Sequence, residues 1–468
     1  MRARILTATV ATLVAGALWA SAAVARSALA GMPALANPPA LQALDPATIL
    51  PPPPYTLAQC QQLTHLSCYN PAQLHRAYGL SSLYAKGLSG QGSTIVIVDP
   101  IGSPTIAHDL SVFDTAFGVP APPSLRIIQP VGHVRPFNPL NPSMLAKAGE
   151  TTLDVEWSHA IAPKAKIVLV ETPVMEAPDT QGFPRFMAAE RFVINHDLGD
   201  VISQSFSLPE QSFWPGEIQT LRRTYIDAER HHVTVLAASN DNGVAGPNRR
   251  GVLQPRRVVQ WPASDPLVTA VGGTALHLDA AGQRTSPDTV WNDTYNPAVS
   301  ALSRQAPPVA WASNGGVSRI FARPAYQRSV RAIVGNRRGV PDVSMSASLS
   351  GAVLIYSSFA ATGGWTLAGG TSEATPEFAG IVALADQYAR TRLHHGRLGL
   401  INPALYRLEA QHAPGIVDVT QGNNSAAYQT KAGIVTVRGY RARPGYDLTT
   451  GIGTINAARF VPELARAG

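Results

Sequence analysis

At 468 residues, with 45% hydrophobic and 14% charged residues, the chain has the composition of a well-packed globular protein rather than of a disordered or fibrous one. Its length allows one large domain or up to about three average ones. The formal net charge of +7 comes from basic residues scattered along the sequence, and without a concentrated basic face the composition argues against nucleic-acid binding.

The first 30 residues have the pattern of a secretory signal peptide. Arg2 and Arg4 precede an apolar run that ends in the small-residue sites "AVA" and "ALA", so cleavage is expected after Ala25 or Ala30. No later segment is both long enough and uncharged enough to span a bilayer. We therefore expect a secreted protein, extracellular or periplasmic, without a membrane anchor.

Residues 31–68 are expected to form a linker or a short pro-segment. This stretch is rich in proline, including four consecutive prolines at 51–54, and such sequences favour extended polyproline II over a packed core. The chain has two cysteines, Cys60 and Cys68. In an exported protein, an even number of closely spaced cysteines predicts a disulfide.

From Tyr69 to residue 468 the pattern predicts one α/β domain. Apolar runs typical of buried strands occur at 93–99, 165–171, 200–207, 232–239, 267–273 and 351–358. Amphipathic segments at 149–162, 185–197 and 217–231 lie between them. This alternation indicates a mainly parallel sheet with helices on both faces, and active residues in such sheets usually follow the strand C-termini.

The stretch "GGTSEATPEFAG", residues 369–380, places Ser372 ahead of a helix that is expected to start near Pro376. Ser372 could simply cap that helix. Alternatively, it could be a nucleophile at a helix N-terminus, where the helix dipole favours developing negative charge. The second interpretation requires a base from elsewhere in the chain.

The base could be a histidine or a carboxylate. A Ser-His-Asp enzyme could use Asp99, the last residue of the run 93–99, as its aspartate, but the chain lacks the Gly-flanked histidine at a helix start that such an enzyme needs. Glu150 and Asp154 in "GETTLDVEW" stand four apart and would share one helix face. The pair could be a solvated acidic face; if it is buried, it would retain a proton and accept the serine proton in acid.

A third candidate group is Asp241 in "VLAASNDNGVAG", residues 235–246, at the end of a predicted strand. Aspartates in such turns commonly bond their own backbone. A protonated Asp241 near Ser372 could instead donate a hydrogen bond to an oxyanion.

Taken together, "GETTLD", "AASNDNG" and "GGTSEATP" resemble the sedolisin family, the serine-carboxyl peptidases, over about residues 69 to 466. The resemblance implies a subtilisin-like three-layer fold with a mainly parallel central sheet. It also implies a secreted, acid-active endopeptidase in which Ser372 is the nucleophile, Glu150 the general base, Asp154 its partner and Asp241 an oxyanion-hole donor. Proteins or peptides would be its substrates, and we expect a monomer.

The resemblance also implies one structural calcium ion near the C-terminus. In this sequence the ligands would be the carboxylates of Asp418 and Asp447 and the backbone carbonyls of Val419, Arg443 and Gly445. These oxygen ligands suit a hard cation, with a water completing the ~6 oxygens that calcium prefers.

The sequence departs from the family pattern at Asn240 and Asn242, which flank Asp241 where the family has glycine and serine, and at Arg443, where glycine is common. Members of the family usually carry a folded pro-domain much longer than residues 31–68.

Three alternative functions stay open: a neutral subtilisin-type enzyme using Asp99, a catalytically silent binding protein with this fold, and a tripeptidyl-peptidase.

Overall fold

The computed structural model describes residues 55–174, 179–303, 305–360 and 363–468. The signal peptide predicted at 1–30 and most of the proline-rich segment therefore lie outside the described residues. In the described part of the chain, no helix is long and apolar enough to cross a membrane.

The central sheet has eight strands, of which seven run parallel. Its order is β10 (Thr289–Val290), β9 (Thr269–Ala275), β7 (Thr234–Ala238), β5 (Val201–Gln204), β2 (Thr94–Pro100), β4 (Lys166–Thr172) and β3 (Leu125–Ile128), with β13 (Val343–Ser346) also paired to β9. The pairing of β10 with β9 is antiparallel, and the pairings β9–β7, β9–β13, β7–β5, β5–β2, β2–β4 and β4–β3 are parallel. The predicted mainly parallel α/β sheet is confirmed.

The smaller sheets contain the remaining strands. One sheet joins β1 (Ser67–Tyr69), β14 (Gly351–Ser357) and β15 (Gly364–Ala368). The others pair β6 (Leu208–Pro209) with β8 (Gln260–Trp261), β11 (Gly316–Ala322) with β12 (Arg337–Val340), β16 (Ile416–Val417) with β19 (Thr454–Ile455), and β17 (Ala426–Thr430) with β18 (Gly433–Val437). The apolar run at 351–358 therefore forms a strand outside the central sheet, a distinction that hydrophobicity alone does not make.

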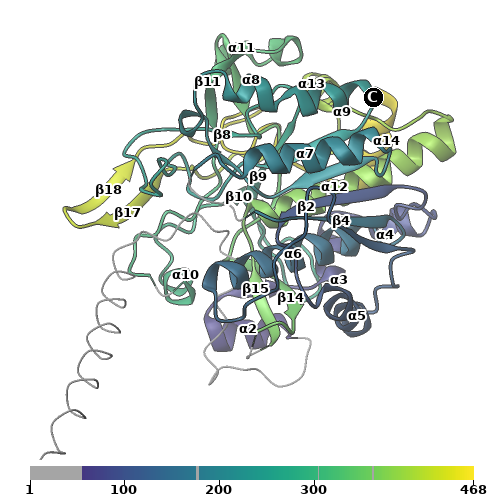
Figure 1. Cartoon of the computed structure of the whole chain (residues 1–468), viewed down its shortest axis with the longest axis horizontal. Coiled ribbons are helices and arrows are strands. Elements are labelled where there is room, and N and C mark those ends of the chain that lie inside the picture. Colours follow the sequence, from purple (N-terminus) through teal and green to yellow (C-terminus); the bar gives the residue numbers. More distant parts are fainter. Residues whose placement is uncertain (1–54, 175–178, 304, 361–362) are drawn as a thin grey trace, which may run out of the picture.

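Helices cover both faces of the central sheet (Figure 1). The helices of the described residues are α2 (Leu57–Thr64), α3 (Pro71–Ala77), α4 (Ser81–Tyr84), α5 (Ile106–Phe117), α6 (Pro142–Ile161), α7 (Phe183–Asn195), α8 (Glu217–Leu221), α9 (Arg223–Arg230), α10 (Pro297–Leu302), α11 (Arg331–Val334), α12 (Thr371–Tyr388), α13 (Asn402–Ala410) and α14 (Ala457–Ala467). Shorter turns are η2 (Glu210–Ser212), η3 (Ala325–Arg328) and η4 (Ala389–Leu393).

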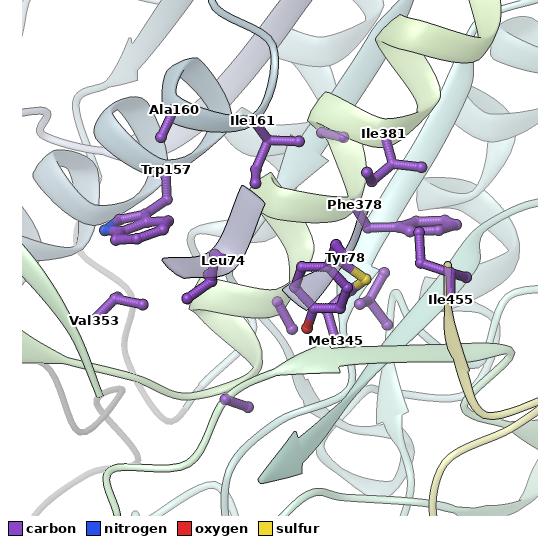
Figure 2. Close-up of a cluster of buried hydrophobic side chains, with 14 of the residues drawn as sticks. Leu74, Tyr78, Trp157, Ala160, Ile161, Met345, Val353, Phe378, Ile381 and Ile455 are labelled. Atoms are coloured by element: carbon purple, nitrogen blue, oxygen red, sulfur yellow. The ribbon is translucent and has the colours of Figure 1, made fainter. Parts of the chain in front are cut away.

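Alternate residues of each central strand enter different cores. Ile95 and Ile97 of β2 pack with α6, α12 and α14, whereas Val96 and Val98 pack with α7, α8 and α9. Because successive side chains of a strand point to opposite faces, the continuous apolar run supplies both cores. Figure 2 shows part of the first of these cores, in which Ile161 of α6 lies near Phe378 and Ile381 of α12.

The packed core begins before residue 69. Cys60 and Cys68 are buried and joined by a disulfide with an S–S distance of 2.00 Å, which confirms the predicted pair. Tyr55 is buried in the same core, and β1 pairs with β14. The structure thus extends the folded domain upstream of Tyr69, into the segment predicted as a linker.

Candidate active site

Glu150 and Asp154 lie one turn apart on α6. The helix begins where Asn141 accepts hydrogen bonds from the N–H groups of Ser143 (3.0 Å) and Met144 (3.3 Å), with Pro142 in the first turn. Every residue of α6 from Lys147 onward is buried. The acidic pair is therefore not a solvated face.

The pKa of Asp154 is raised well above its ordinary value. Burial is the main cause, since it disfavours the charged carboxylate, and the negative charges of Asp99 and Glu150 raise the pKa further. A hydrogen bond with Ser205 and the positive charge of Lys147 act in the opposite direction. The cluster of acidic groups therefore tends to retain a proton.

Lys147 and Ser205 were not among the predicted site residues. Lys147 precedes Glu150 by less than one turn, a spacing at which side chains on a helix meet, so its position was readable from the sequence. Ser205 follows β5, and no sequence spacing relates it to α6. Asp99, considered only as part of a subtilisin-type arrangement, lies at the end of β2 and acts on Asp154.

Ser372 is the second residue of α12, which begins at Thr371. The alternative in which Ser372 caps the helix does not hold, and the expected helix start near Pro376 is wrong. The capping position belongs to Gly370, whose φ of 101° favours glycine, and Pro376 lies inside the helix. Ser372 is 3% exposed, and its N–H belongs to the first helical turn, which has no intrahelical acceptor.

Asp241 is held against the residue that precedes Ser372. Its Oδ1 accepts hydrogen bonds from the backbone N–H (2.8 Å) and the hydroxyl (2.7 Å) of Thr371. The Thr371 hydroxyl oxygen in turn accepts from the N–H of Asn240 (3.0 Å). Asn240 has a φ of 93°, in the region that favours glycine, and asparagine is among the few other residues that enter it. This explains how Asn240 can stand where a glycine was expected.

Helices α6 and α12 are packed together and run in the same direction. A Cβ on Gly380 of α12 would lie 2.6 Å from the Cβ of Ile161, so the backbones approach closely here. Further along, Gln387 accepts hydrogen bonds from the N–H groups of Ser89 and Gly90 (2.8 Å each). A Cβ on Gly90 would lie 3.0 Å from Ala162, directly after α6. The C-terminal ends of both helices therefore meet the same loop.

This parallel packing relates Ser372 to the acidic pair. The same number of residues separates Gly380 from Ser372 and Ile161 from Leu153. Because each helical residue advances about 1.5 Å, Ser372 and Leu153 lie at corresponding heights. Glu150 and Asp154 lie on either side of Leu153 in the sequence. The two carboxyl groups are therefore at about the same height along the helix axes as Ser372.

A second buried acidic pair, Glu373 and Glu377, lies on α12 itself. The pKa of each is raised well above its ordinary value, mainly by burial. A hydrogen bond with Ser346 opposes the shift of Glu373, and the charge of Glu373 adds to the shift of Glu377. Glu373 and Glu377 were not predicted as a buried pair, although their four-residue spacing, the same as that of Glu150 and Asp154, was a possible signal.

The predicted calcium ligands are brought together at one loop. Asp418 Oδ2 accepts a hydrogen bond from the N–H of Gly445 (2.8 Å), and Asp447 Oδ2 accepts one from the N–H of Arg443 (3.0 Å). Asp447 is 1% exposed, and its pKa is raised by burial despite several hydrogen bonds to its carboxylate. The pKa of nearby Glu409 is likewise raised, mainly by burial and partly by Asp418. A cation would relieve this concentration of negative charge, so the oxygen donors present fit calcium.

The described residues contain no group of three or more His, Cys, Asp or Glu side chains suited to a metal ion. A calcium site here would therefore depend on two carboxylates together with backbone carbonyls. That composition excludes the imidazole and thiolate ligands that zinc prefers.

Comparisons with known proteins bear on the family and the fold of this chain. Residues 144–402 match the model of the subtilase family. The chain is 32% identical to kumamolisin from Bacillus sp. (strain MN-32) over 413 residues, which cover 85% of this chain and 64% of kumamolisin. It is 30% identical to human tripeptidyl-peptidase 1 over 321 residues, covering 66% of this chain and 50% of that protein.

A solved structure of Pseudomonas sedolisin, a serine-carboxyl proteinase complexed with two molecules of pseudo-iodotyrostatin, matches the fold with a TM-score of 0.68 and 26% identity. The match covers 85% of this chain and 97% of that one. By contrast, the chain spans 64% of kumamolisin and 50% of tripeptidyl-peptidase 1.

Proposed function

The chain belongs to the subtilase family and, within it, to the sedolisin group of serine-type peptidases, and we propose that it is a secreted, acid-active endopeptidase. The observation that carries the proposal is the alignment of α6 with α12. It sets the buried pair Glu150 and Asp154 at the height of Ser372, while Asp241 is bonded to Thr371.

In the proposed reaction, the Ser372 hydroxyl attacks the carbonyl carbon of a peptide bond, and Glu150 takes its proton. Glu150 then delivers that proton to the leaving amine as the acyl-enzyme forms. Water attacks the acyl-enzyme by the reverse path, with Glu150 again accepting the proton. Asp154 orients Glu150 and shares a proton with it, a role that the raised pKa of Asp154 supports.

The negative oxygen that develops on the substrate needs hydrogen-bond donors. We assign this role to the N–H of Ser372, in the first turn of α12, and to the protonated carboxyl of Asp241. Within the segment 201–210, β5 is already paired on both sides, with β2 and with β7. The residues that follow β5, beginning with Ser205, would therefore bind the extended substrate by backbone hydrogen bonds. The contact of Ser205 with Asp154 supports this placement.

We further propose that Asp418, Asp447 and the carbonyls of Val419, Arg443 and Gly445 hold one calcium ion with a structural role. The convergence of both carboxylates on the loop 443–447 supports this assignment. The ion would stabilise the loop and take no part in the chemistry.

Hydrolysis of a denatured protein between pH 3 and 8, by the wild type and by Ser372→Ala, tests the function. The proposal predicts an acid optimum that the substitution abolishes. Maximal activity near pH 8 would favour a neutral enzyme, and no activity at any pH would favour a silent binding protein. Release of tripeptides alone, from substrates with a free N-terminus, would replace endopeptidase with tripeptidyl-peptidase action, an alternative motivated by the similarity to tripeptidyl-peptidase 1.

A further inference from the structure

Six arginines from three separate parts of the sequence, 249–257, 319 and 337, gather around two adjoining cavities, which we call the arginine groove. One cavity, of about 450 Å³, is lined by Arg257, Arg319 and Arg337. The other, of about 350 Å³, is lined by Arg249, Arg250 and Arg256. Gln211 lines both cavities, and Arg256 and Arg257 are neighbours in the chain, so the two form one surface feature.

None of these six guanidinium groups forms an ion pair with a carboxylate in the described parts of the chain. Their hydrogen bonds go to neutral oxygens instead: Arg249 Nε donates to the carbonyl of Ser212 (2.6 Å) and Arg257 Nε to that of Arg438 (2.7 Å). Glu210 lies close by, but its carboxylate accepts from the N–H of Arg319 (2.8 Å) and from a serine hydroxyl rather than from a guanidinium. The groove therefore carries uncompensated positive charge.

Aromatic rings hold two of these arginines in place. The guanidinium of Arg249 lies 3.6 Å from the ring centre of Trp214, which is 63% exposed. That of Arg257 lies 4.6 Å from the ring centre of Tyr440. A guanidinium over an aromatic ring keeps N–H groups at its edge, and this edge matches the two oxygens of a carboxylate.

The larger cavity of the groove lies near the loop that carries Asp241. Gly315 and Val258 line the larger cavity. Asn314, next to Gly315, donates its N–H to the carbonyl of Asn240 (2.8 Å), directly before Asp241, and its side chain donates to the carbonyl of Val258 (3.2 Å). The cavity wall is thus bonded to the loop that carries Asp241.

The groove also continues the segment 205–210, to which we assign the substrate backbone. Glu210 donates its N–H to the carbonyl of Val259 (3.0 Å), and β6 pairs with β8. Gln211, shared by both cavities, follows directly. Figure 1 shows β8, β11 and the β17–β18 hairpin on the left half of the molecule. A peptide lying along 205–210 would reach the groove with residues beyond its scissile bond.

We propose that the arginine groove binds aspartate and glutamate side chains of the substrate, so that the enzyme prefers peptides with an acidic segment on one side of the cleavage point. This inference rests on the proposed peptidase function. Guanidinium groups stay charged at all relevant pH values, and their field favours ionised carboxylates even in mildly acidic solution.

The test compares internally quenched peptides that share one neutral core and differ only in a flanking segment of three glutamates or three glutamines, placed on either side. For the wild type at low salt, kcat/KM should be about tenfold or more higher for one glutamate-flanked peptide than for its glutamine counterpart. The difference should lie mainly in KM and shrink as salt rises. In the variant Arg257→Gln/Arg319→Gln/Arg337→Gln, the ratio should fall to about one.

A control variant, Arg126→Gln/Arg392→Gln/Arg459→Gln, makes the same change in charge on other elements and should keep the wild-type ratio. Equal ratios for the acidic and neutral peptides in the wild type, or an unchanged ratio in the groove variant, would overturn the proposal. Thermal unfolding of each variant checks that the fold is retained.

Direct binding separates this inference from the peptidase function. Fluorescence anisotropy of the labelled acidic peptide with Ser372→Ala should show binding that the groove substitutions weaken about tenfold or more, whether or not the wild type cleaves any peptide. Absence of binding would overturn the inference by itself. Tighter binding of a single-stranded oligonucleotide of equal charge would assign the groove to nucleic acid instead and also overturn it.

Discussion

Asp241 Oδ1 accepts hydrogen bonds from both the backbone N–H and the hydroxyl of Thr371, at 2.8 and 2.7 Å. The loop after β7 is thereby tied to the first residue of α12, directly before Ser372. One carboxyl thus both fixes the helix N-terminus and stands beside the proposed nucleophile.

This relationship predicts different outcomes for two substitutions of Asp241. Asp241→Ala removes the proposed oxyanion donor and the acceptor for Thr371, so kcat should fall by about 10² to 10³. Asp241→Asn keeps an acceptor oxygen and carries N–H donors at every pH. Asp241→Asn should therefore retain measurable activity, and its kcat should begin to fall at a higher pH than that of the wild type. Measurement of kcat across pH 3 to 8 would show this. Equal losses in both variants at every pH would contradict the donor role.

Thr371→Val separates the structural part of the relationship from the chemical part. The valine keeps the backbone N–H to Asp241 but removes the hydroxyl that bonds both Asp241 and Asn240. We expect the free energy of unfolding to fall by about 1 to 3 kcal/mol, because buried partners are left unsatisfied. Urea unfolding measures this loss, and Thr371→Ser, which keeps the hydroxyl, should restore most of it.

The close approach of α6 and α12 predicts that Gly380 is intolerant of substitution. In Gly380→Ala, the new methyl group would lie 2.6 Å from Ile161, and overpacking of this kind typically costs about 1 to 3 kcal/mol. Because the same packing sets Ser372 against the acidic pair, kcat should fall as well. Gly396→Ala, where an added Cβ meets nothing within 4 Å, is the matched control. It should change neither the free energy of unfolding, measured with urea, nor kcat.

The buried pair Glu373 and Glu377 predicts greater stability in acid. Because the folded-state pKa of each is raised above its unfolded value, the folded protein binds more protons between the two values. Their stabilising contribution is complete below the unfolded pKa of about 4.3 and is lost as the pH rises through the folded-state pKa.

Denaturant unfolding at a series of pH values measures this effect in the wild type and in Glu373→Gln/Glu377→Gln. Other polar groups face Glu373 and Glu377 and also influence their protonation. They are Tyr69, Tyr78, Ser346 and, beyond Tyr78, the ion pair of Arg284 with Asp288. The double variant should lose less stability than the wild type between pH 5 and 8. If the free energy of unfolding of the double variant changed with pH as steeply as that of the wild type, the prediction would be wrong. Other groups, such as Asp154, would then dominate the pH dependence of stability.

The calcium assignment predicts that a chelator lowers the thermal unfolding midpoint of the wild type. Asp447→Asn should lower it without chelator and should make it insensitive to added calcium, because a binding ion stabilises only the folded state. Asp279, a partly buried turn aspartate that accepts from the N–H groups of Ala281 and Gln283, gives the control Asp279→Asn, which should keep the chelator response. A wild-type midpoint that is independent of calcium would contradict the site.

The sequence predicted the type of sheet and the helix that carries Glu150 and Asp154, because apolar runs and a periodic amphipathic segment are local signals. It did not predict the start of α12. The helix begins at Thr371 because Asp241, distant in the sequence, accepts from its N–H, and Gly370 supplies the backbone angle. The sequence also showed no sign of the arginine groove. Its basic residues look scattered along the chain, and the arginines of the groove come together only through tertiary packing.

The central claim is that a carboxylate, and no histidine, activates Ser372. The most direct test is the pH dependence of kcat/KM for one peptide with the wild type and with Glu150→Gln, which keeps the shape of the side chain but cannot accept the proton. The account predicts a wild-type maximum in acid and a loss of about 10² to 10⁴ in Glu150→Gln at every pH. Full activity of Glu150→Gln, or a wild-type maximum near pH 8, would contradict it.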